Sequence, residues 1–160
     1  SPKDTVVKVH IDSMLTKENM LKVTLVLKPD ETIVDKKTGR LTTDTAVRFP
    51  MQDDMGEVQY RLGSAPEPAE IYIEARGEPR NWPLDTYTTD PIRAEWLVGA
   101  GDSSHYEAAK IEVDGSADGF DIDVARVADN PNDVVIKLKR TRAQRVIDIG
   151  ICLVLITLPA

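Results

Sequence analysis

Cysteine and histidine are scarce in this chain of 160 residues. The single cysteine, Cys152, excludes an intramolecular disulfide and leaves the redox compartment open. The two histidines, His10 and His105, have no cysteine near them in the sequence, so no zinc-binding spacing is present. The sequence therefore predicts no zinc centre.

Motifs of catalysis and of nucleotide binding are also missing. The chain contains no nucleophile elbow Gly-x-Ser-x-Gly, no phosphate loop and no dinucleotide fingerprint. Asp102, Ser103 and His105 are the residue types of a catalytic triad, but triad members converge from distant segments and these are close neighbours. We therefore expect no catalytic residues, no cofactor and no enzyme activity.

Basic charge is in short supply, because 20 Lys and Arg are outnumbered by 27 Asp and Glu, for a formal net charge of −7. Asp148 is the only acid after position 136, so the body of the chain is more acidic still. An acidic body repels nucleic acid, whose binding depends on neutralising phosphates. One basic stretch is expected to meet lipid headgroups. It consists of Lys137, Lys139, Arg140, Arg142 and Arg145.

A helical stripe of apolar residues is absent before residue 140, and period-two alternation takes its place. The alternation is clearest in Val7–Ile11, Leu21–Leu27, Ile71–Ala75, Ile92–Val98, Phe120–Val124 and Val134–Leu138. Shorter candidates are Ala46–Phe49, Val58–Leu62 and Tyr106–Val113. Strands with one apolar face, separated by turns, predict an all-β fold, an antiparallel β-sandwich of immunoglobulin-like outline. A closed barrel fits the same pattern.

Residues 147–160 form the most apolar run of the chain and carry one charge, Asp148. A spanning helix needs about twenty apolar residues, so the run matches the first turns of a membrane helix whose remainder is missing. A buried core strand over Ile147–Leu158 and a helix that docks on a partner are the alternatives. Pro159 favours the membrane helix over a central strand. We therefore predict a β-domain over residues 1–140, and a basic collar with the beginning of a transmembrane helix over residues 141–160.

The most distinctive internal segment reads Asn-Trp-Pro-Leu-Asp-Thr-Tyr and begins at Asn81. Pro83 fixes its own φ and holds Trp82 extended. Asp85 is expected to accept hydrogen bonds from backbone N–H groups of the turn. Trp82 and Tyr87 are expected to anchor the turn through a large buried area. We interpret Trp82, Pro83, Asp85 and Tyr87 as a structural turn motif that leads into a strand. A pair of ligand-binding aromatic residues is the alternative.

The Trp-Pro-Leu-Asp-Thr-Tyr segment resembles the Tyr-Pro-Phe-Asp-Arg-Tyr signature of domain-of-unknown-function family 4436, a family of actinobacterial multi-pass membrane proteins. Leu84 and Thr86 stand in place of the aromatic and arginine residues of that signature. The layout is similar too, with strands ending in Lys28-Pro29 and a basic stretch ahead of an apolar run. The resemblance implies an N-terminal membrane anchor, an extracytoplasmic β-domain and further C-terminal membrane helices, but no biochemical activity.

Two other likenesses are weaker. An aromatic-Pro-x-Asp turn followed by a proline-bearing membrane helix also resembles the extracellular domain of pentameric ligand-gated channels, whose paired cysteines are absent here. Asp114, Ser116, Asp118 and Gly119 match positions one, three, five and six of a calcium loop, but Ala125 replaces the glutamate of position twelve. We interpret this segment as an acidic hairpin turn.

The sequence thus predicts a noncatalytic extracytoplasmic domain of an integral protein of the cell membrane. Its expected role is that of a scaffold or recognition module in a membrane or cell-envelope assembly, and a ligand- or lipid-sensing domain coupled to membrane helices is the alternative. The expected partners are the membrane, through the C-terminal segment, and a membrane or envelope protein, with no nucleic acid. The basic collar alone would place the domain in the cytoplasm. Because long domains translocate largely regardless of charge, the placement implied by the resemblance is kept.

Overall fold

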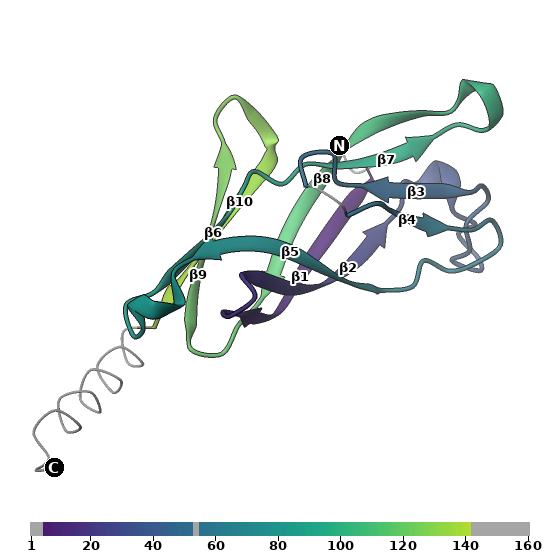
Figure 1. Ribbon diagram of the computed structural model, residues 1–160. Helices are drawn as coiled ribbons and strands as arrows, with labels where there is room; N and C mark the ends of the chain where they lie inside the picture. The colour runs from purple at the N-terminus through teal and green to yellow at the C-terminus, as the bar shows by residue number, and fades with distance from the viewer. Residues whose placement is uncertain (1–4, 53–54, 142–160) are drawn as a thin grey trace, which may run out of the picture.

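The structure, a computed structural model, describes residues 5–52 and 55–141 (Figure 1). These residues contain strands and three short 3₁₀-helices, and no α-helix. The strands are β1 (Val6–Leu15), β2 (Met20–Lys28), β3 (Thr45–Arg48), β4 (Glu57–Tyr60), β5 (Ala69–Gly77), β6 (Thr86–Thr89), β7 (Ala94–Val98), β8 (His105–Gly115), β9 (Phe120–Val127) and β10 (Asn130–Arg140). The 3₁₀-helices are η1 (Glu31–Ile33), η2 (Pro79–Asn81) and η3 (Gly101–Ser103). The predicted all-β class is confirmed.

Hydrogen bonds join the described strands into one sheet in the order β4-β3-β7-β8-β1-β2-β5-β6-β10-β9. Nine strand pairs make up this order, and β1 with β8 is the parallel one, with Val6 opposite Lys110 and Ile11 opposite Gly115. The prediction of a purely antiparallel arrangement is therefore wrong for that pair. Alternation of side chains fixes which face of a strand is buried but not the direction of its neighbour. The division into the two sheets of a sandwich stays a prediction.

The sheet curls, so that strands far apart in the strand order approach each other (Figure 1). Ile92, just before β7, forms an isolated bridge with Val134 of β10. Beside this bridge the Arg93 guanidinium forms two hydrogen bonds of 2.9 Å with the buried Asp133 carboxylate. The curl therefore encloses the core, and a partly buried ion pair secures the beginning of β10.

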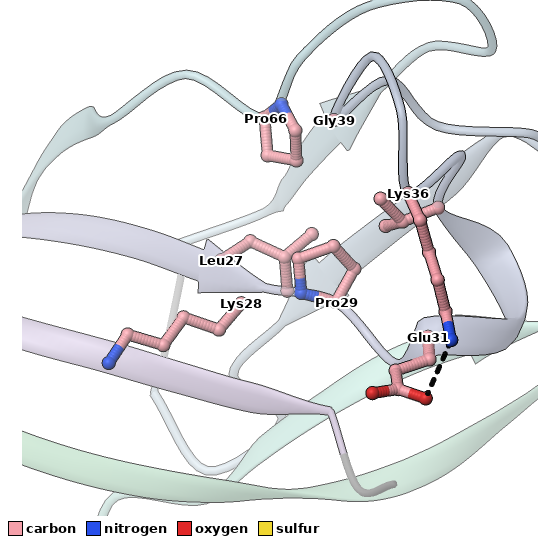
Figure 2. Close-up of a pocket in the computed structure, with 8 residues that line it drawn as sticks. Leu27, Lys28, Pro29, Glu31, Lys36, Gly39 and Pro66 are labelled. Carbon is pink, nitrogen blue, oxygen red and sulfur yellow. Dashed lines mark ion pairs between the residues drawn. The ribbon is translucent and has the colours of Figure 1, made fainter.

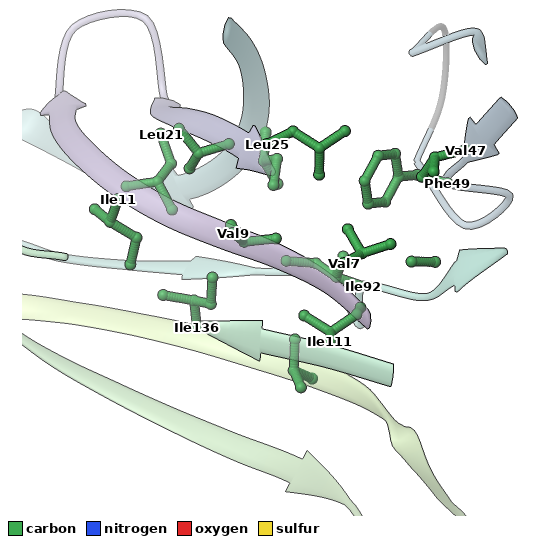
Figure 3. Packing of buried hydrophobic residues seen from close by; sticks show 14 of the residues in the cluster. Val7, Val9, Ile11, Leu21, Leu25, Val47, Phe49, Ile92, Ile111 and Ile136 are labelled. Atoms are coloured by element: carbon green, nitrogen blue, oxygen red, sulfur yellow. The ribbon is translucent and has the colours of Figure 1, made fainter. Parts of the chain in front are cut away.

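The buried faces of β1, β2 and β10 are those that the alternation predicted. Val7, Val9 and Ile11 of β1 are buried, and Leu21 and Leu25 of β2 lie beside them. Figure 3 shows these side chains in one cluster with residues of β3, β8 and β10. The turn motif was expected to lead into a strand, and that strand is β6, which spans only Thr86–Thr89 and lies between β5 and β10.

The two ends of the described chain lie at opposite ends of β1. Thr5 precedes β1, and its hydroxyl accepts a hydrogen bond from the Asp30 amide just after β2. The Thr141 amide donates to the Gly119 carbonyl in the turn that follows β8, and β8 runs parallel to β1. We call these the Thr5 end and the Thr141 end of the sheet. The turn between β1 and β2, residues 16–19, lies at the Thr141 end.

The predicted membrane segment lies outside the described residues, except for Thr141. Strand β10 ends at Arg140, and the division of the chain at residue 140 stays a prediction. Among residues 5–52 and 55–141, no helix is long and apolar enough to cross a membrane.

Candidate functional site

The predicted turn motif connects η2 with β6 at the Thr141 end of the sheet. Its backbone is closed by a hydrogen bond of 2.8 Å from the Leu84 amide to the Asn81 carbonyl, and the Trp82–Pro83 peptide bond is cis. Pro83 and Asp85 are buried, whereas Trp82 and Leu84 are 43% and 59% exposed. Alternate residues of the turn therefore point into the domain and into solvent.

Asp85 is the centre of a buried polar cluster. Its carboxylate accepts a hydrogen bond of 2.7 Å from the Tyr87 hydroxyl and bonds of 3.0 and 3.2 Å from Nε and Nη2 of Arg140. The Arg140 guanidinium lies over the Phe120 ring, 4.4 Å from its centroid, and the Tyr87 and Phe120 rings meet edge to face at 5.9 Å. We call these four residues the Asp85–Arg140 cluster. It ties the last residue of β10 to the turn motif.

Electrostatics keep the cluster ionised. Burial alone would raise the pKa of the Asp85 carboxyl, but the hydrogen bonds from Arg140 and Tyr87 outweigh burial and hold that pKa below its ordinary value. Burial, followed by the bond to Asp85, raises the pKa of the Tyr87 hydroxyl to about 12. Asp85 is therefore a carboxylate and Tyr87 a neutral donor at neutral pH, as a stable ion pair requires.

Two expectations for the turn need correction. Trp82 was expected to anchor the turn by burial, but only Tyr87 does so, because residues 83, 85 and 87 face the core and 82 faces away. Asp85 was expected to bind backbone N–H groups of the turn, but its hydrogen bonds to other residues come from the side chains of Tyr87 and Arg140. Strands β6 and β10 pair directly after the turn. The side chains of Tyr87 and Arg140 are therefore within reach of the Asp85 carboxylate.

From the sequence, Arg140 was assigned to the basic stretch, and its role in the cluster was missed. The sequence did contain a sign that Arg140 points inward. The buried residues Val134, Ile136 and Leu138 alternate along β10, and the same alternation puts Arg140 on their face. Arg140 is thus a partner of Asp85, whereas Lys139 beside it is exposed. Phe120 was predicted as the start of a strand, but its contact with Arg140 depends on pairing that the sequence does not reveal.

A shallow pocket of about 530 Å³ lies at the Thr5 end, on the side of the molecule away from the turn motif. Residues of β2 and of the segment after it line one side, and Pro66 lines the other (Figure 2). The Lys36 ammonium is 3.7 Å from the Glu31 carboxylate, and Lys28 extends to the opposite side, where it pairs with Glu112. Both lysines are exposed, and each already forms an ion pair with a glutamate. The pocket therefore offers a ligand no unpaired ammonium group from these two residues.

The segment from Asp114 to Gly119, which matches part of a calcium loop and was interpreted as an acidic hairpin turn, is arranged differently. Asp114 bonds to Lys8 at 2.9 Å and to His10 at 2.7 Å, on β1, and these two partners lower the pKa of its carboxyl. The turn that follows is not a hairpin, because β8 pairs with β1 and β7 while β9 pairs with β10. Within the part of the chain that the structure describes, no three His, Cys, Asp or Glu side chains are grouped to hold a metal ion.

His105 lies in an exposed local cluster. Its ring bonds to the Glu107 carboxylate at 2.9 Å and to the Ser103 carbonyl at 3.2 Å, and these contacts raise the pKa of the imidazole. The Ser103 hydroxyl donates instead to the Ala100 carbonyl at 2.8 Å. Serine and histidine side chains are therefore neighbours here without bonding to each other.

Two buried tyrosines differ in whether their hydroxyls have partners. The Tyr60 hydroxyl on β4 is the one buried side-chain polar atom without a hydrogen-bond partner among residues 5–52 and 55–141. Burial raises the pKa of Tyr60 to about 12. Tyr87, by contrast, donates to a carboxylate. An unpaired buried hydroxyl destabilises the folded state, whereas a hydrogen bond from a hydroxyl to a charged group stabilises it.

The change from tyrosine to phenylalanine should therefore have opposite effects at these two positions. Tyr60→Phe is expected to leave the free energy of unfolding unchanged or raise it by up to about 1 kcal/mol, and Tyr87→Phe to lower it by about 2 kcal/mol. Urea unfolding of both variants, followed by tryptophan fluorescence, measures the difference. Equal losses in both would show that Tyr60 has a partner in solution.

The family described as "Domain of unknown function (DUF4436)" has a model that matches residues 1–138. The match covers all ten described strands up to Leu138, including the turn motif and most of β10. No curated protein and no solved structure matches the chain.

Proposed function

This chain belongs to the DUF4436 family, and on that premise we propose that it is a noncatalytic extracytoplasmic domain of an integral membrane protein. Its role in this proposal is that of a scaffold or recognition module within a membrane or cell-envelope assembly. The family match leaves the role open, so the support comes from the way in which the domain ends and from one free edge of its sheet.

The Asp85–Arg140 cluster is the observation that carries the proposal. One face of strand β10 is buried, and the strand is held near both ends by partly buried ion pairs, Arg93 with Asp133 and Arg140 with Asp85. The sequence continues from Arg140 into the remaining basic residues and the apolar run 147–160 with no glycine- or proline-rich spacer between them. A domain fixed so firmly at its exit is suited to holding a defined position above a bilayer.

Strand β9 supplies a surface for recognition. It is the last strand in the sheet order, so its outer backbone edge has no neighbouring strand among the described residues. Val124 of β9 is opposite Ile136 of β10, which is fully buried, yet Val124 is 40% exposed. Residues directly opposite each other point to the same face, so a strand added beside β9 would extend both the sheet and the core.

A capture experiment tests this proposal. Full-length protein is isolated from native membranes in mild detergent, and bound proteins and lipids are identified by mass spectrometry. We expect a stoichiometric membrane or envelope protein, and we expect Val124→Lys to reduce its recovery several-fold, because lysine on an edge strand opposes strand addition. Val124 is already partly exposed, so the change should alter stability by less than about 0.5 kcal/mol.

Leu62→Lys is the matched control. Leu62 is 60% exposed and lies in the turn after β4, at the other edge of the sheet order. This variant should recover the partner as the unmodified protein does. Equal recovery with all three proteins would exclude β9 as the contact, and the absence of any protein partner would contradict the assembly role.

The pocket at the Thr5 end favours a second candidate, a ligand-sensing domain coupled to membrane helices. Its volume of about 530 Å³ falls within the usual range of small-molecule sites, although its opening is wide and its lysines are ion-paired. The same capture experiment distinguishes the two roles. A reproducible small molecule or lipid on a protein without partners would favour sensing.

A further inference from the structure

Trp82 and Leu84 form an exposed apolar tip on a firmly held base. Trp82 is 43% exposed and Leu84 is 59% exposed, and Pro83 between them is buried. The base is held by the hydrogen bond from Leu84 to Asn81 and, one residue further, by the buried Asp85. Leaving part of a tryptophan and of a leucine, two residues apart on one turn, in water forgoes the free energy that their full burial would contribute.

Other large exposed apolar side chains of the described residues are isolated in the sequence. They are Met51, Leu62, Tyr72 and Val124. They lie in different strands and turns, and single exposed apolar residues are normal on a protein surface. The Trp82–Leu84 tip therefore stands out as a pair.

The tip lies at the end of the domain from which the chain continues toward its apolar run. Arg140 bonds to Asp85 one residue after Leu84, and Thr141 bonds to Gly119 in the neighbouring turn. Figure 1 shows the loop between β5 and β6 at the same end of the sheet as the end of β10. The next residues in the sequence include Arg142 and Arg145 and then the apolar residues 147–160.

A bilayer interface matches the chemistry of the tip. Tryptophan is enriched at membrane interfaces because its ring is apolar and its indole N–H can bind headgroups or water, and leucine adds apolar area. The tip itself adds no unpaired charge from its neighbour Arg80, since this exposed side chain is 3.5 Å from the Glu78 carboxylate. A contact of this kind does not require anionic lipid.

We propose that the Trp82–Leu84 tip inserts into the interfacial region of the lipid bilayer and fixes the tilt of the domain on the membrane. This inference rests on the proposed function, because it requires that the chain be anchored by its C-terminal segment. The tip, the Asp85–Arg140 cluster and the end of β10 then act as one rigid contact between domain and lipid.

Tryptophan fluorescence tests the insertion directly, because the chain has two tryptophans, Trp82 and the buried Trp96. The 160-residue chain, with its apolar run extended by leucine residues to the length of a membrane-spanning helix, is reconstituted in phosphatidylcholine vesicles with ordinary or brominated acyl chains. Trp96→Phe leaves only Trp82, and we expect it to lose most of its emission in brominated vesicles. Trp82→Phe leaves only Trp96, whose emission should stay unchanged. Adding Leu84→Asp to Trp96→Phe should restore most of the lost emission.

Flotation of the same samples separates the two hypotheses. Vesicles that carry the protein while Trp82 keeps its emission would overturn the insertion and leave the proposed function intact. Protein that does not float with the vesicles would overturn both. If Trp96→Phe does not fold, the emission of Trp82 is obtained by subtracting the Trp82→Phe signal from that of the unmodified chain, and the same criterion applies.

Discussion

Replacing Arg140 with methionine is expected to lower the free energy of unfolding by about 3 kcal/mol, because a buried carboxylate then loses its charge partner. Asp85 is 2% exposed, and it would keep only the hydrogen bond from Tyr87 among its side-chain partners. Methionine retains much of the apolar stem of arginine and can still pack on Phe120. The loss would therefore reflect the missing guanidinium rather than a cavity.

A double-mutant cycle isolates this interaction. The variants are Arg140→Met, Asp85→Asn and the two together, and urea unfolding is followed by tryptophan fluorescence. Asparagine keeps an acceptor for the Tyr87 hydroxyl. The double variant should therefore lose about 2 kcal/mol less free energy of unfolding than the two single losses added together. Additive losses would show that Asp85 and Arg140 do not interact in solution.

The pH dependence of Arg140→Met provides an independent check. In the unmodified protein, the pKa of the folded-state Asp85 carboxyl lies below its ordinary value of 3.8. The contribution of the ionised Asp85 to the free energy of unfolding is therefore fully present above pH 3.8 and is lost as the pH falls through the folded-state pKa. Without Arg140, burial raises the folded pKa of Asp85, and protonation at acidic pH relieves the buried charge. The stability difference between the two proteins should therefore narrow as the pH falls from neutral toward 3.8 and below. A constant difference would contradict this account.

Local patterns in the sequence predicted most of the strands but not how they pair. The alternation of Val7, Val9 and Ile11, and that of Val134, Ile136 and Leu138, identified the buried faces correctly. The side-chain period of two is the same for parallel and antiparallel neighbours, so it could not reveal that β1 joins β8 in parallel. The acidic turn after β8 was accordingly taken for a hairpin, although it leads to a distant part of the sheet.

The turn motif was located from its residues, and its function in the fold was only partly predicted. Pro83, Asp85 and Tyr87 are buried as an anchoring role requires, but Trp82 is exposed. Arg140 is 55 positions away from Asp85, and pairs at that separation depend on strand order. Counting the alternation of β10 one step further would have placed Arg140 on the buried face, where a charged residue requires a partner.

Replacing Gly115 with alanine is expected to lower the free energy of unfolding by at least about 4 kcal/mol, a loss that single substitutions seldom reach. Gly115 ends β8 opposite Ile11, where the parallel pair of strands closes. A Cβ atom there would lie 2.6 Å from the Ile11 amide nitrogen and closer still to its carbonyl oxygen. Both contacts are with backbone atoms, so relief requires that β1 and β8 separate. The φ of +94° adds a cost for any residue with a side chain.

Gly63→Ala separates the two contributions. Gly63 has a similar φ of +83°, but a Cβ atom there would meet no atom within 4 Å. This variant should lose only the conformational cost of about 1 to 2 kcal/mol. Urea unfolding and circular dichroism of both variants measure the difference, and failure of Gly115→Ala alone to fold would be the extreme form of the expected result. Equal losses at the two positions would mean that β1 and β8 do not approach each other closely at Gly115, and the parallel pair at the centre of the sheet would have to be reconsidered.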